Sequence, residues 1–278
     1  RDFCLSRGLG DVYKRQVSLP FLSRKKAEFG MGIARMEDRY FQTNIIDFSE
    51  TKHDESTYSI FGGSIVLEGS TLNARQFATQ GSREKMAAQI FTGTEHFRSG
   101  VSKVTKGTPE PYKKVQSWLQ VSYQNETYHK VSPKFTLGAY LEAYYSSRNF
   151  SNNYTATLMQ AGEFTPTAHS KVTYNEAFRA NQYAGVGTMP IYQLSESFQL
   201  RGEFYGFIPI FPIKKDEYGQ AYYGKAFTKF EYLGEISLVF QLSFGSISAY
   251  VNHYSSPSND WNVGLTLGWQ LFNSRFVE

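Results

Sequence analysis

Apolar and polar residues alternate along stretches that have the length of a β-strand, and residues 262–271 show this most clearly. The odd positions of this stretch carry Val, Leu, Leu, Trp and Leu, whereas the even positions carry Asn, Gly, Thr, Gly and Gln. Successive side chains of a strand point to opposite faces, so the pattern predicts one apolar and one polar face. About ten residues is also the length that a tilted strand needs to cross a bilayer.

The same alternation recurs upstream, at residues 135–143 and 198–206 and again at 236–244. Within these stretches Arg201, Glu203 and Glu142 fall on the side opposite the apolar set. A charge that faces lipid costs roughly 2–4 kcal/mol at the bilayer midplane. We therefore expect these three side chains to face the lumen of a barrel.

The alternation predicts about ten strands in all. Some connections, such as 195–196 and residue 245, are short, whereas 148–178 and 212–225 are long. Alternation of short turns with long loops is typical of outer-membrane barrels, and a soluble β-sandwich is the alternative. The predicted strands are 27–36 (with an extension to 47), 56–70, 83–95, 112–128, 134–147, 179–194, 197–211, 226–244, 246–255 and 260–272.

Composition adds support for an all-β, antiparallel transmembrane β-barrel. The 278 residues are 41% hydrophobic and 19% charged, and no window holds 18 consecutive apolar residues, so no transmembrane helix is predicted. Aromatic residues make up 17% of the chain, with 20 Tyr and 23 Phe. Girdles of aromatic side chains at the two membrane interfaces would account for this content.

Residues 1–16 resemble the in-frame translation of a sequencing adapter, so we expect the fold to occupy residues 17–278. The segment holds Cys4, the one cysteine of the chain. It also holds four basic and two acidic residues, so its exclusion lowers the formal net charge from +4 to +2. A charge this small does not favour nucleic acid as a partner.

The last predicted strand also carries a pattern of a polar residue, a glycine, an apolar residue and an aromatic residue at set spacings. Asn262, Gly264, Leu267 and Trp269 occupy these positions. The pattern resembles the signal that the barrel assembly machinery recognises, so that machinery is an expected partner during biogenesis. An ordinary amphipathic strand is the alternative.

Three stretches resemble known outer-membrane proteins. Residues 69–81, with Thr-Leu-Asn near the start and Phe-Ala-Thr-Gln-Gly at the end, resemble a segment of bacterial surface antigen barrels. Residues 164–171 and 178–183, and the ending 271–275, resemble the barrel of Bacteroidetes-type patatin-like phospholipases. Together the resemblance covers most of residues 27–275.

The resemblance implies a barrel of about sixteen strands, of which this chain holds roughly the last ten. We therefore expect an open, curved antiparallel sheet with two free edges, and the last strand as strand sixteen. Arg179 matches the arginine of an outer loop that folds into the lumen in these barrels. Ala180 and Asn181 replace the expected glycine, and a solvated loop arginine is the alternative.

The resemblance further implies an outer-membrane module that anchors a patatin-type lipase or helps to pass it across the membrane. The lipase motifs themselves are absent: residues 62–66 and 100–104 lack the second glycine of Gly-x-Ser-x-Gly, and no Asp precedes Gly or Ala. We expect no catalytic residue, metal or other cofactor in this chain. Outer-membrane lipid is an expected partner, and a homodimer is left open.

Three other functions stay open at this point: the barrel of an assembly factor, a diffusion porin, and a hydrolase within the barrel wall. The last would use the adjacent residues His169 and Ser170. The basic clusters at 24–26 and 113–114 are interpreted as solvated strand ends or as contacts with lipid head-group phosphates.

Overall fold

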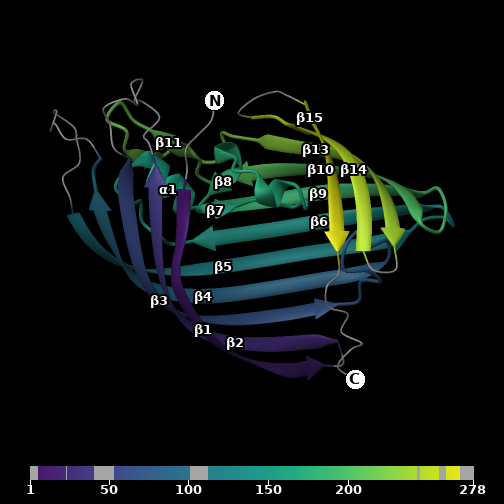
Figure 1. The fold of residues 1–278 in the computed structure, drawn as a ribbon, viewed down its shortest axis with the longest axis horizontal. Coiled ribbons are helices and arrows are strands. Elements are labelled where there is room, and N and C mark those ends of the chain that lie inside the picture. Colours follow the sequence, from purple (N-terminus) through teal and green to yellow (C-terminus); the bar gives the residue numbers. More distant parts are fainter. Residues whose placement is uncertain are drawn as a thin grey trace.

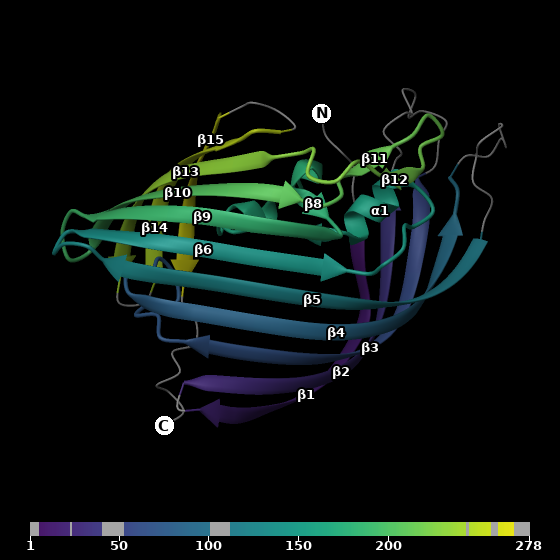
Figure 2. The same ribbon diagram turned by 180° about the vertical axis from the view of Figure 1, so that it is seen from behind.

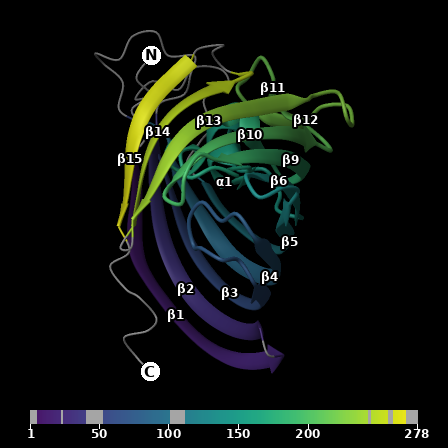
Figure 3. The same ribbon diagram turned by 90° about the vertical axis from the view of Figure 1, so that its right-hand side faces the viewer.

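One large antiparallel sheet dominates the computed structural model, which describes residues 6–22, 24–40, 53–100, 112–242, 245–256 and 261–269. The sheet has eleven strands, which follow one another in chain order, and β1 and β15 are its two edges. It curves into an open trough (Figures 1, 2 and 3). Its strands are β1 (Ser6–Leu22), β2 (Lys25–Tyr40), β3 (Asp54–Ser70), β4 (Gly81–Arg98), β5 (Tyr112–Lys130), β6 (Phe135–Ser146), β9 (Gln182–Gln193), β10 (Phe198–Pro209), β13 (Glu231–Leu242), β14 (Gly245–Tyr254) and β15 (Trp261–Trp269).

The smaller elements lie in two long connections. Residues 147–181 contain α1 (Tyr154–Gln160), β7 (Gly162–Glu163), η1 (Ser170–Val172), η2 (Glu176–Phe178) and β8 (Arg179–Ala180). The connection between β10 and β13 contains the hairpin of β11 (Ile213–Lys215) and β12 (Ala221–Tyr223). Within the described part of the chain, no helix has the length and the apolar character needed to span a membrane.

The prediction of an open, curved, antiparallel β-sheet is confirmed. All ten predicted segments correspond to strands, namely β2–β6, β9, β10 and β13–β15. The predicted alternation of connections is present except between β3 and β4, where residues 71–80 form a longer connection at the short-turn end. Short turns join β1 to β2, β5 to β6, β9 to β10 and β13 to β14 at one end of the sheet. Longer connections, including 147–181 and 210–230, lie at the other end.

The N-terminal segment differs from the expectation. We expect the fold to begin at residue 17, whereas β1 begins at Ser6 and pairs Tyr13 with Ile33 and Gln16 with Gly30. The free edge of β2 offers backbone N–H and C=O groups, and an adjacent extended segment satisfies them whatever its origin. The origin of residues 1–16 as translated adapter stays a prediction.

The two faces of the sheet differ in chemistry as the alternation predicts. Apolar side chains on the outer, convex face are exposed: Leu238 is 43% exposed and Ile90 is 64% exposed. Polar neighbours on the inner face are buried, with Ser237 at 1% and Glu203 at 7%. A soluble sandwich would cover its apolar face with a second sheet, but the other two sheets of the described residues have two strands each and belong to the long connections. The sheet thus exposes its apolar face and buries its polar one.

Candidate functional site

The concave side of the sheet holds a folded connection, residues 147–181, which we call the inner segment. Figure 2 shows α1 and β8 of this segment within the curve of the sheet. Asn153 caps α1 by accepting a hydrogen bond from the Ala156 amide at 2.8 Å. The Asn153 side chain also donates to the Tyr40 hydroxyl on β2 at 2.9 Å. Helix α1 is therefore fixed to the N-terminal side of the trough.

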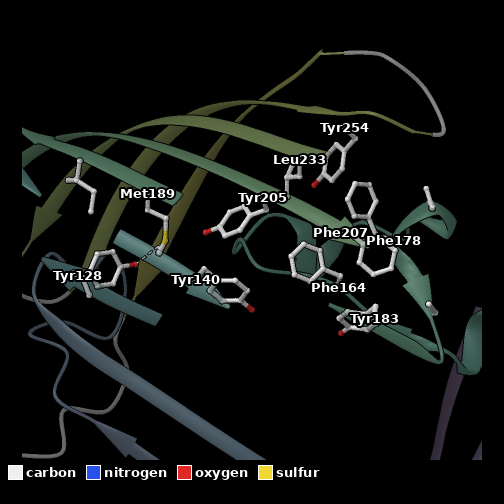
Figure 4. Packing of buried hydrophobic residues seen from close by; sticks show 14 residues of the cluster. Tyr128, Tyr140, Phe164, Phe178, Tyr183, Met189, Tyr205, Phe207, Leu233 and Tyr254 are labelled. Atoms are coloured by element: carbon white, nitrogen blue, oxygen red, sulfur yellow. Dashed lines mark hydrogen bonds between the residues drawn. The ribbon is translucent and has the colours of Figure 1, made fainter. Parts of the chain in front are cut away.

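Aromatic side chains attach the rest of the inner segment to the opposite side of the trough. Phe164 stacks on Phe207 of β10, with ring centroids 5.6 Å apart, and packs edge-on against Tyr183 of β9 at 6.0 Å (Figure 4). A Cβ atom at Gly185 would lie 2.1 Å from the Phe164 ring, so only glycine leaves room for this contact. Phe178 packs against Phe207 from the other side, at 5.7 Å. The inner segment is thus part of the hydrophobic core.

Arg179 is buried at the end of the inner segment. Its Nη1 donates to the carbonyl oxygens of Leu158 and Met159, both at 3.3 Å. Its Nη2 lies 2.7 Å from a carboxylate oxygen of Glu163, and its guanidinium lies 4.5 Å from the centre of the Tyr174 ring. The arginine joins the C-terminal end of α1 to the short β7–β8 sheet. It is therefore not a solvated loop residue, and its partners all belong to the inner segment.

His169 links the inner segment to the last three strands. Its Nδ1 lies 2.7 Å from Oε1 of Glu235 on β13, and its Nε2 lies 2.7 Å from the hydroxyl of Thr266 on β15. Its ring stacks on Tyr250 of β14, with centroids 3.4 Å apart. His169 and Glu235 are 6% and 2% exposed. We call this group of four side chains the His169 clasp.

The suggested pair of His169 and Ser170 does not form a catalytic arrangement. The Ser170 hydroxyl donates to the Thr167 carbonyl at 2.9 Å, and it accepts from the Thr167 amide at 3.0 Å. Both contacts close a local turn. The imidazole contacts Glu235 and Thr266 instead, and these lie 66 and 97 residues further along the chain. No spacing in the sequence signals contacts this distant.

Arg201 and Glu203 lie on the inner face of β10, where they form a short ion pair. Arg201 also donates to the Tyr128 hydroxyl and, at 2.9 Å, to the carbonyl of Ala78. Ala78 belongs to the connection between β3 and β4, which therefore folds back into the concave side of the trough. The Gln241 side chain holds the same connection by donating to Phe77 at 3.3 Å. In the sequence, residues 69–81 stand out only by a resemblance, whereas the structure brings Phe77 and Ala78 against β10 and β13.

Glu142 lies on β6 and also points to the inner side. Its two carboxylate oxygens accept hydrogen bonds from Tyr140 at 2.5 Å and from Tyr183 at 2.6 Å. The structure therefore places Glu142, Arg201 and Glu203 on the same face, but Glu142 bonds to a different set of side chains from the Arg201–Glu203 pair. None of them shares a contact with Arg179 in the described residues.

The residues of the suggested assembly signal lie along β15. Asn262 donates to Asn252 of β14 at 3.3 Å, and Leu267 is 79% exposed on the outer face. A Cβ atom at Gly264 would lie 2.5 Å from the hydroxyl of Tyr250, so glycine makes room for the ring that stacks on His169. Trp269 pairs with Gly245, and its side chain lies outside the described atoms.

No group of three or more His, Cys, Asp or Glu side chains within the described ranges is placed to hold a metal ion. A scan against protein-family models finds no match for the chain, and a search of curated proteins finds no relative.

Proposed function

We propose that this chain is part of an outer-membrane β-barrel that serves as the anchor or translocation module of a patatin-like phospholipase. In this proposal the chain carries none of that lipase's catalytic residues. The proposal places the outer face of the sheet against lipid and the inner segment in the lumen. It places the long connections on the outer side of the membrane, as is usual for such barrels.

One observation carries the proposal: the sheet exposes apolar side chains and buries charged ones. Phe204 and Leu265 are 47% and 79% exposed, whereas Arg201 and Glu235 are 3% and 2% exposed. In water this arrangement leaves a large apolar surface uncovered, which soluble monomers avoid. In a bilayer it is the favourable one, because lipid contacts the apolar face and charge stays inside.

The inner segment favours an anchor or translocation role over a diffusion porin. It contacts β2 through Asn153 and β9 and β10 through Phe164, so it crosses the trough from one side to the other. A porin keeps a water-filled lumen, whereas here aromatic side chains occupy the interior. The link to a patatin-type lipase rests on the sequence resemblance of residues 164–171 and 178–183.

The membrane part of the proposal is tested by cell fractionation and by gel migration. We expect the full chain to be extracted from outer membranes by detergent and to migrate differently before and after heating. The variant Leu238→Arg places a charge on the apolar outer face. It should reduce the fraction of the chain that migrates as the folded form before heating. Tyr218→Arg is the control, because Tyr218 lies in the β11–β12 hairpin and is 72% exposed. It should leave the folded fraction before heating unchanged. Recovery of the chain in the aqueous fraction without detergent would refute the proposal.

The lipase part is tested by the coding sequence upstream of residue 17. A patatin segment with Gly-x-Ser-x-Gly, followed by one small periplasmic domain, is the expected result. A row of several such small domains would instead indicate an assembly factor, and a signal peptide alone would indicate a porin.

A further inference from the structure

Five basic side chains gather on the outer face of the sheet, at the long-connection end of strands β2–β5. These strands lie side by side (Figure 1). All five side chains are exposed, and we call them the basic patch: Arg35, Arg39, His96, Arg98 and Lys113.

The strand register places the basic patch in adjacent rows. Arg39 and Arg98 both lie opposite Glu55, and His96 lies directly opposite Lys113. Neighbouring strands are about 4.8 Å apart, so the patch spans roughly 14 Å across the three intervals from β2 to β5. Successive residues are about 3.4 Å apart, so it also spans roughly 14 Å along β2, from Arg35 to Arg39. The patch is therefore wider than one phosphate group.

Most of these basic side chains have no carboxylate partner among the described residues. Arg39 contacts Glu37 at 2.5 Å, and Glu55 lies on the same face. The other four basic side chains form no ion pair with any residue that the structure describes. Of the sequence pair 113–114, only Lys113 belongs to the patch, because Lys114 points inward and donates to the carbonyl of Phe150 at 2.9 Å.

The opposite end of the same strands behaves differently. There Lys25 contacts Glu84 at 3.1 Å, and Glu68 contacts both Lys26 at 3.3 Å and Arg83 at 2.9 Å. The basic residues at 25–26, which the sequence offered as contacts with head-group phosphates, therefore already have carboxylate partners. At the long-connection end, by contrast, four of the five side chains of the basic patch form no ion pair with a described residue.

The basic patch borders exposed apolar surface on the same strands. Met31 and Ile33 precede Arg35 on the outer face of β2 and are 62% and 58% exposed, and Ile90 on β4 is 64% exposed. A ligand that matches both surfaces has apolar chains and an anionic head group. Arg and Lys side chains bind phosphate oxygens through charge-assisted hydrogen bonds.

We propose that the basic patch binds the phosphates of a lipid in the leaflet that faces the long connections. Its width suits a lipid that carries more than one phosphate. This inference rests on the proposed function, because it requires the outer face to be in a bilayer. Each Lys or Arg near a membrane surface contributes about 1 kcal/mol, which corresponds to roughly fivefold in affinity.

The test uses the full chain folded into phosphatidylcholine nanodiscs and titrated with bisphosphorylated lipid A. The double variant Arg98→Gln, Lys113→Gln should weaken binding by roughly 25-fold. The matched control Lys130→Gln, Lys134→Gln removes the same charge from exposed positions at the short-turn end and should leave binding unchanged. Arg98→Lys with Lys113→Arg keeps the charge and should retain binding, which separates charge loss from misfolding.

Lipid A without its phosphates should bind at least tenfold more weakly than the phosphorylated form. Millimolar inorganic phosphate should not occupy the site alone, because it lacks the acyl chains. The inference is overturned if lipid A binds equally well with and without its phosphates. It is also overturned if the patch variant Arg98→Gln, Lys113→Gln and the control variant Lys130→Gln, Lys134→Gln lose the same affinity. Either result leaves the proposed function standing. Failure of the wild-type chain to insert into phosphatidylcholine bilayers overturns both.

Discussion

Replacement of His169 by Ala tests how firmly the inner segment is attached to the sheet. The imidazole contacts β13, β14 and β15 through Glu235, Tyr250 and Thr266. Its removal leaves the Glu235 carboxylate, which is 2% exposed, without its one hydrogen-bond partner, since Oε2 has none among the described residues. The substitution therefore creates an unpaired buried charge.

The expected loss of stability in His169→Ala follows from these contacts. A buried carboxylate that loses its hydrogen-bond partner is left unsatisfied, which lowers the free energy of unfolding by about 3 kcal/mol. The lost stacking on Tyr250 adds about 0.5–1.5 kcal/mol. Thr266 is partly exposed, so water can replace the imidazole as its hydrogen-bond partner. The loss of this hydrogen bond therefore adds little to the loss of stability. We expect a total loss of about 4 kcal/mol.

Urea unfolding of the full chain in detergent micelles, followed by tryptophan fluorescence, measures this loss. The double variant His169→Ala, Glu235→Gln removes the charge as well as the imidazole and should recover about half of the lost stability. A loss below 1 kcal/mol for His169→Ala, or no recovery in the double variant, would refute the argument that the hydrogen bond to the buried Glu235 carboxylate holds the clasp together.

Three further predictions concern the inner segment. Arg179→Ala removes the hydrogen bonds to the Leu158 and Met159 carbonyls and the ion pair with Glu163, so limited proteolysis should cut within 147–181 faster than in the wild type, while Arg179→Lys should give an intermediate rate. Burial raises the pKa of Glu176 above its usual 4.5, against the opposing influence of nearby Lys215, Arg179 and Lys229. The stability that depends on Glu176 is thus present below pH 4.5 and is lost as the pH rises, so Glu176→Gln should flatten the decline of the urea midpoint between pH 4 and 7. Gly185→Leu would collide with the Phe164 ring and should expose the same segment to protease, whereas Gly185→Ala should have a smaller effect.

The period-two pattern was enough to predict the strands and their faces. Leu200 and Leu238 fall on the exposed face and Arg201 on the buried one because the alternation of a strand is local and depends on no distant contact. The strand ends were less well predicted. Segment 179–194 was expected as one strand, but β9 begins at Gln182, because Arg179 and Ala180 pair with β7 instead.

The interior of the trough could not be predicted in the same way. In the His169 clasp, the imidazole contacts Glu235 and Thr266, which lie 66 and 97 positions further along the chain. The connection at 71–80 likewise contacts β10 and β13. Such contacts depend on how far the sheet curves, which the alternation of side chains does not specify. Apart from Lys113, the residues of the basic patch cannot be singled out from the sequence for a related reason: the register of β2–β5 decides which basic residues meet carboxylates.

The most direct test of the membrane assignment compares two adjacent positions on β4. Ile90 is 64% exposed on the outer face, whereas the Gln89 side chain points to the inner face. Cys4→Ser removes the one cysteine of the chain. A fluorophore that is sensitive to its environment is then attached at Ile90→Cys or at Gln89→Cys, in the chain folded into bilayers with quencher-labelled lipid. If the outer face contacts lipid, quenching is strong at position 90 and weak at position 89. Equal, weak quenching at both positions, with both open to water-soluble quenchers, would contradict the membrane assignment.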